Sequence, residues 1–150
     1  MRLFGTIVLL CALCTGPADA VCLVTPLSDD LASADTVFVA TITRVTMSKP
    51  PAEMRDKERY VVQYDFDVVK VFKGDASIVT WLVTGARFND PTDDVSWKQA
   101  EQSRYVPGDS ILVVSGSGEA PVSSIGCTPS RPWDSEAQHA AAKYFSATPN

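Results

Sequence analysis

The chain has 150 residues, of which 45% are apolar, and it carries a formal net charge of −5. This acidity argues against nucleic acid and anionic membrane surfaces as partners, because both would repel it. The length fits a single domain with enough apolar residues for a core.

Residues 1–20 have the features of an export signal. Arg2 precedes an apolar run over residues 3–14, and a small-residue cleavage site ends at Ala20. The run is short for a retained membrane anchor, which stays the alternative. We expect a mature chain that begins at Val21, a secreted or periplasmic location, and no membrane span once the signal is removed.

Two of the four cysteines, Cys11 and Cys14, belong to this signal, so the mature chain keeps Cys22 and Cys127. An even pair in an exported protein predicts one disulfide. The bridge would close a loop of about a hundred residues, for which the chain-entropy model gives roughly 4–5 kcal/mol. The alternative is two free thiols.

Runs of β-branched and alternating residues predict strands along the mature chain. The run over 36–46 is dense in β-branched residues, and the run over 59–73 alternates apolar with polar side chains. Further strands are expected over 78–84, 110–115 and 122–126.

The strand over 59–73 has the clearest pattern. Its core-facing residues are expected to be Tyr60, Val62, Tyr64, Phe66, Val68 and Phe72. Gln63, Asp65 and Asp67 alternate with them and should face the other way. Two adjacent apolar pairs near its end, at 68–69 and 71–72, break the alternation and predict a bulge or bend.

A helix is predicted near the C-terminus. Asp134 or Ser135 can cap it, and an apolar stripe that continues to Phe145 should pack on the sheet. The predicted fold of domain 21–150 is therefore mainly β: a small, partly open, five-stranded barrel with a C-terminal α-helix.

Three short motifs occur in order: ADTVFVA at 34–40, FDVVKVFKG at 66–74 and YVPGDSILV at 105–113. With Gly126-Cys127-Thr128 and the following helix, they resemble bacterial netrin-like domains. That family shares its OB-fold barrel with the tissue inhibitors of metalloproteinases. The resemblance implies an OB-fold in which Cys22 is tied to the last barrel strand.

The same resemblance implies one function. The animal inhibitors place the free amine and carbonyl of an N-terminal cysteine on the zinc of a protease, and this role would fall on Cys22. The chain departs from that pattern, because Val21 would precede the cysteine and Val24 stands where the family has a second cysteine. Metalloprotease inhibition is kept as an alternative.

No residue set predicts a usual catalytic or metal centre. Asp65 and Asp67 share a strand face and, with a loop acid such as Asp94, could serve a carboxylate-based hydrolase. The simpler interpretation is a solvent-exposed strand face. His139 lacks a partner motif and the usual zinc ligands are too few, so no cofactor or metal is expected.

We therefore expect a non-catalytic interaction module, not an enzyme, whose ligand is unknown. Its partner should be an envelope or extracellular protein, and the chain itself should be a monomer. OB barrels bind through one sheet face and the adjacent loops, which here are 48–57, 85–107 and 115–121. Trp97, in the longest of them, is a candidate partner contact.

Overall fold

The computed structural model describes residues 25–52, 54, 59–84, 88–89, 105–116, 122–125 and 128–147. The expected signal peptide and the residues Cys22, Cys127, Asp94 and Trp97 lie outside the described residues. None of the helices within these ranges has the length and hydrophobicity needed to cross a bilayer.

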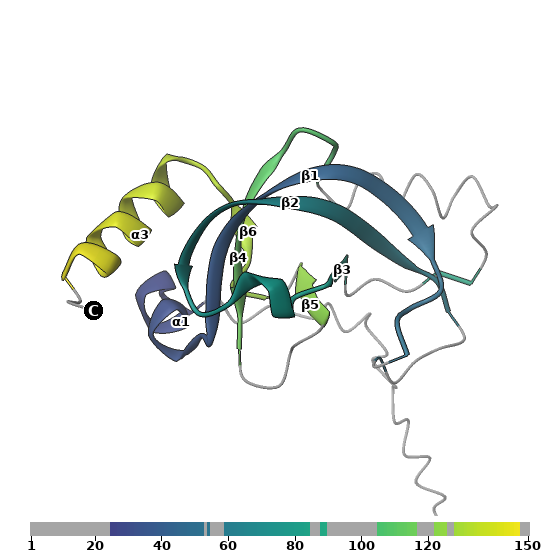
Figure 1. The fold of residues 1–150 in the computed structure, drawn as a ribbon, viewed down its shortest axis with the longest axis horizontal. Coiled ribbons are helices and arrows are strands. Elements are labelled where there is room, and N and C mark those ends of the chain that lie inside the picture. Colours follow the sequence, from purple (N-terminus) through teal and green to yellow (C-terminus); the bar gives the residue numbers. More distant parts are fainter. Residues whose placement is uncertain are drawn as a thin grey trace, which may run out of the picture.

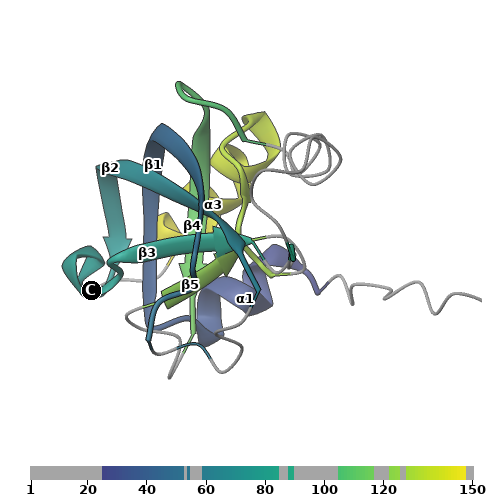
Figure 2. The ribbon, with the colours of Figure 1, turned by 90° about the vertical axis from the view of Figure 1, so that its right-hand side faces the viewer.

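The described strands form one six-stranded sheet in the order β5-β3-β2-β1-β4-β6 (Figure 1). The strands are β1 Thr36–Ser48, β2 Val61–Lys73, β3 Trp81–Thr84, β4 Ser110–Ser115, β5 Val122–Ile125 and β6 Arg131–Pro132. Neighbours are antiparallel except β3 and β5, which lie next to each other in parallel (Figure 2).

Two α-helices and a short 3-10 helix accompany the described sheet. They are α1 Leu27–Ser33, η1 Ala76–Ile78 and α3 Ser135–Ala147. The predicted C-terminal helix is α3, and Asp134 caps it, because its Oδ1 accepts the Ala137 N–H at 2.9 Å. Helix α1 and the short β6 were not among the predicted elements.

The prediction of a mainly β fold with a C-terminal helix is confirmed. The third strand is shorter than expected, because Ile78 ends η1 and the strand starts only at Trp81. No hydrogen-bonded ladder among the described strands joins β5 to β4, although some of their Cα atoms lie within 8 Å of each other. Closure into a barrel therefore stays a prediction.

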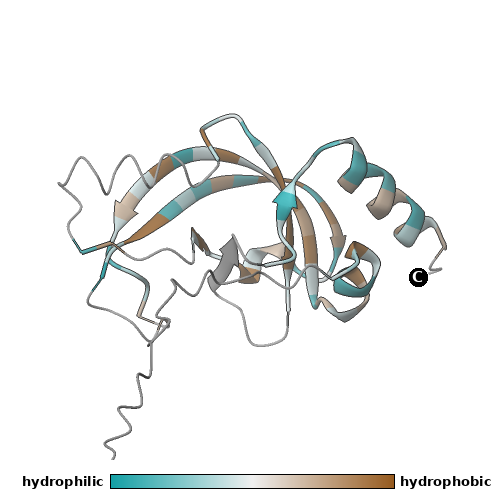
Figure 3. Ribbon diagram, turned by 180° about the vertical axis from the view of Figure 1, so that it is seen from behind, coloured by the Kyte–Doolittle hydropathy of each residue, from teal (hydrophilic) through white to brown (hydrophobic). Residues whose placement is uncertain are grey.

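The first half of β1 is buried on both faces, which explains its unbroken apolar sequence. Val37 and Val39 point to one side and Phe38, Ala40 and Ile42 to the other, and all five are at most 2% exposed. Apolar positions recur along both long strands (Figure 3).

Two groups of buried side chains lie on opposite faces of this sheet. The inner cluster comprises Phe38, Ala40, Ile42, Val62, Tyr64, Ala76, Val79, Leu82, Phe88, Ile111 and Val113. The helix-side cluster comprises Leu27, Leu31, Ala34, Val37, Val39, Leu112, Val114 and Ala137. Helices α1 and α3 thus cover one face, while the curvature of the sheet encloses the other.

Strand β2 follows its predicted alternation only in its first half. Val62 and Tyr64 are buried in the inner cluster, and Phe66 stacks on Phe38 with 5.9 Å between ring centroids. The prediction that Val68 faces the core is wrong, since it is 44% exposed. Phe72 packs on the helix side instead.

The register between β1 and β2 explains why the alternation along β2 changes after Phe66. Val39 pairs with Lys70 and Ala40 with Val68, so Val69 is an extra residue on β2, and a similar shift leaves Phe72 as a second extra residue. Each extra residue changes which neighbours share a face. The predicted bulge in this region is therefore confirmed.

Candidate interaction surface

The two predicted strand acids have different surroundings. Asp65 Oδ2 accepts a hydrogen bond from Arg44 Nε at 2.6 Å, and Gln63 Nε2 donates to its Oδ1 at 3.4 Å. Asp67 is exposed and makes no hydrogen bond or ion pair with any described residue. Asp65 is thus held by an arginine on the surface, and Asp94, the loop acid of the hydrolase alternative, lies outside the described residues.

His139 lies on the exposed side of α3 and borders a groove between α1 and α3 of about 620 Å³. The groove is lined by Leu27, Ser28, Glu136, His139, Ala140, Lys143, Tyr144 and Ala147. Such a volume lies within the range of small-ligand pockets. No described side chain hydrogen-bonds to His139, so nothing among them orients its ring for proton transfer.

The described part of the chain contains no candidate set of metal ligands. No three of its His, Cys, Asp or Glu side chains come together as potential ligands.

A more distinctive feature is the row of exposed valines on β2. Val68, Val69 and Val71 are 44%, 63% and 47% exposed. Single exposed apolar residues are ordinary on a protein surface, but a cluster of them indicates a binding surface. We call residues 66–71 of β2 the valine edge.

Among the described strands, none pairs with the backbone of the valine edge on its outer side. Strand β3 pairs with β2 only at Gln63 and Tyr64, and no other described strand pairs with that side. The reason is the path that follows β2: after Gly74 the chain enters η1, whose Ala76 packs into the inner cluster. Backbone amide and carbonyl groups along an unpaired edge remain able to pair with another chain.

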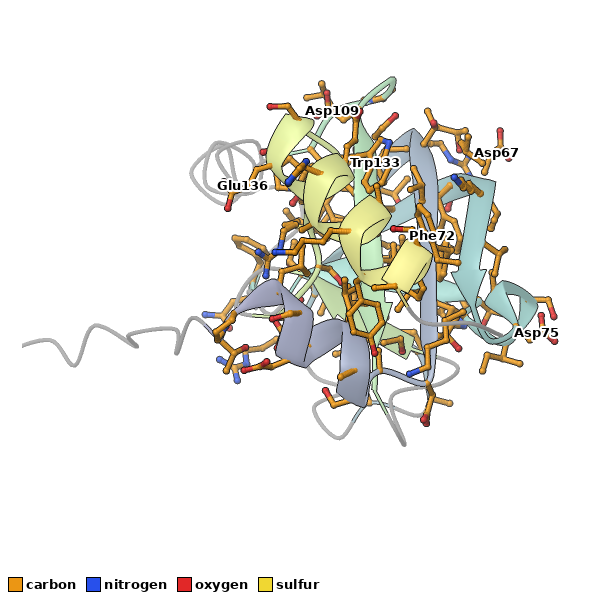
Figure 4. The ribbon with its side chains drawn as sticks, turned by 90° about the vertical axis from the view of Figure 1, so that its left-hand side faces the viewer. Asp67, Phe72, Asp75, Asp109, Trp133 and Glu136 are labelled. Carbon is orange, nitrogen blue, oxygen red and sulfur yellow. The ribbon has the colours of Figure 1, made fainter. Side chains whose placement is uncertain are left out.

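The lysines of this segment are directed toward the helix side. Lys70 Nζ lies 4.5 Å from the centroid of the Phe72 ring, and Lys73 Nζ donates to the carbonyl oxygens of Leu31 and Ala32 at 3.4 and 3.1 Å. Asp67 lies toward the outer margin of the sheet, whereas Phe72 lies between β2 and α3 (Figure 4). The three valines are thus the main apolar surface of the edge.

The loops predicted to form the binding surface fall mostly outside the described residues, as does Trp97. Of the expected sites 48–57, 85–107 and 115–121, the structure describes 48–52 and 54 of the first, 88–89 and 105–107 of the second, and 115–116 of the third. The valine edge was not predicted as a site. Its signal is the DVVKVF sequence at 67–72, which has four apolar residues where strict alternation would allow three.

Comparison with known proteins adds no functional information. No family model matches the sequence, and no match was found among curated proteins. The resemblance to netrin-like domains therefore stays a prediction.

Proposed function

We propose that this chain is an exported, non-catalytic interaction module that binds an envelope or extracellular protein through the valine edge of β2. The observation that carries the proposal is the exposure of Val68, Val69 and Val71 along a strand segment that has no outer partner among the described strands.

Strand addition is the binding mode that this surface favours. In that mode an extended segment of the partner pairs with an exposed sheet edge, so that main-chain hydrogen bonds supply affinity and alternate side chains supply specificity. An unpaired run of β2 offers the main-chain groups, and its valines offer apolar contacts beside them.

The surroundings of the acids favour this proposal over the hydrolase alternative. Asp65 is engaged with Arg44, and Asp67 stands exposed on the strand surface. A carboxylate pair of the glycosidase type needs both groups free to face the substrate, whereas Asp65 is held by Arg44.

A matched pair of lysine variants tests the proposal. Val69 and Val106 are the two most exposed valines among the described residues, at 63% and 57%, but Val106 lies before β4 rather than on the valine edge. The purified mature chain and its Val69→Lys and Val106→Lys variants are crosslinked to proteins of the envelope fraction. Hydrogen exchange of the β2 amides is then followed with and without that fraction.

We expect Val69→Lys to reduce both the crosslinked product and the protection of residues 66–71 at least tenfold, because a charge would replace apolar contact. Val106→Lys should behave like the native chain. Equal loss in both variants, or protection that appears elsewhere but not on β2, would overturn the proposal.

A further inference from the structure

We infer that the valine edge pairs with the same edge of a second copy of this chain, in an antiparallel two-fold dimer. This inference rests on the proposed function, since it names the partner of that site. It replaces the monomer expected from the sequence. A second copy also satisfies the expectation that the partner is an exported protein.

One register brings opposite charges together. If Val68 faces Val69 of the second copy, Asp67 faces Lys70 of the second copy. Two-fold symmetry then creates the same pair twice. Opposite charges that face each other across an antiparallel pair are stabilising, whereas like charges are destabilising. Asp67 is available for this pairing, since no described residue binds its carboxylate.

The same register matches the faces of the strand. Asp67 and Lys70 pair with Thr41 and Val39 of β1, on the face opposite the inner cluster. Phe66 and Val71 pair with Ile42 and Phe38, which belong to that cluster. In the dimer Phe66 would face Val71 of the second copy, so that apolar residues meet on one side and charges on the other.

Neighbouring registers lack this match. A shift by one residue places Asp67 opposite Val71 and Val68 opposite Lys70, which mixes charged and apolar residues. A register centred on Lys70 places the two copies of that lysine against each other. The alternatives therefore lose the charge pairs that the first register forms twice.

Two features limit the length of the paired segment. The extra residue Val69 bends the strand, and Phe72 turns toward α3 and ends the edge. A short ladder buries little surface, so we expect a reversible dimer with a dissociation constant in the micromolar range.

Charge reversal and its repair test this register. The mature chain is studied by analytical ultracentrifugation at low salt over a range of concentrations. Asp67→Lys and Lys70→Asp should each weaken dimerisation at least tenfold, because each puts like charges opposite one another. The double variant Asp67→Lys/Lys70→Asp restores opposite pairs and should dimerise like the native chain. Glu136→Lys, an exposed reversal on α3, is the control, and circular dichroism verifies folding.

The outcomes separate the inference from the proposed function. A native chain that stays monomeric, or a double variant that fails to regain dimerisation, would overturn the self-pairing. If Val69→Lys still reduced capture of another protein in that case, the proposed function would stand. If Val69→Lys changed neither dimerisation nor capture, both would fail.

Discussion

Gly74 shows how a single residue fixes the turn that leaves the valine edge open. Its φ is +69°, and a Cβ at this position would overlap the backbone carbonyl oxygen of Asp35. Hydrogen bonds from the Ser77 hydroxyl, and then from the Ser77 backbone N–H, lower the pKa of the neighbouring Asp75 carboxyl below its ordinary value of 3.8. Together these residues direct the chain from β2 into η1.

Replacing this glycine tests the steric requirement. Gly74→Ala should lower the free energy of unfolding by about 3 kcal/mol or more, since it adds backbone overlap to the strain of a positive φ. Gly108→Ala is the matched control, because Gly108 has a φ of +99° but open space around its Cβ position. We expect that control to cost only about 1–2 kcal/mol in urea unfolding. Equal losses in the two variants would show that the contact with Asp35 is unimportant.

At the scale of elements, the two bulges of β2 mark the limit of what its sequence predicts. The alternation is reliable up to Phe66, because the one irregularity in that part is an extra residue on β1, Thr43, and β2 itself has none. The adjacent apolar pairs indicate a bulge, but they do not say which side chain turns to which face. That choice depends on long-range partners, namely β1 for Val69 and the aromatic side chains near α3 for Phe72.

Helix α1 was not predicted from the sequence, because it too depends on contacts with distant residues. It has 7 residues and no side-chain cap, so its local signal is small and its stability comes from packing of Leu27 and Leu31. Pro26 before it, and Asp29 and Asp30 in its first turn, are the signals that could have revealed it.

The attachment of α3 to the sheet depends on Phe72. Its ring centroid lies 5.0 Å from that of Phe145 and 5.7 Å from that of Trp133. Phe72→Ala should lower the free energy of unfolding by about 2–3 kcal/mol, somewhat less than for a fully buried ring, and should speed hydrogen exchange in α3. Val106→Ala, at an exposed site before β4, should have an effect below about 0.5 kcal/mol. If the α3 amides exchange at native rates in Phe72→Ala, the helix is held by other contacts.

At the scale of the whole molecule, the sequence predicts the class of fold but not how its edges are completed. The strand runs and the C-terminal helix follow from local patterns, whereas the parallel pairing of β3 with β5 joins distant segments. Strands β4 and β6 pair at Leu112 and Arg131. Next to this pair, the buried Ser130 Oγ accepts a hydrogen bond from the Val114 N–H at 3.0 Å, so a side chain takes the place of a backbone partner. The sequence likewise does not predict that the outer side of β2 beyond Tyr64 is without a described partner strand, because this depends on the path of the chain after Gly74.

A contact between Asp30 and Arg131 joins the two segments that follow Cys22 and Cys127 in the chain. Asp30 Oδ2 lies 3.4 Å from Arg131 Nη2, and Asp30 Oδ1 accepts the hydroxyl of Thr25. Thr25 and Asp30 come shortly after Cys22 in the chain, and Arg131 comes shortly after Cys127. The segments that follow the two cysteines are therefore held together, which supports a bridge between them.

We expect alkylation of the native mature chain to find no free thiol before reduction and two after it. Reduction should lower the free energy of unfolding by roughly 4–5 kcal/mol, because the unfolded chain regains the freedom of a loop of about a hundred residues. The double variant Cys22→Ser/Cys127→Ser should match the reduced chain and should not respond to reductant. Two reactive thiols in the untreated native chain, with the same stability before and after reduction, would mean that the Asp30–Arg131 contact joins these segments without a covalent bond.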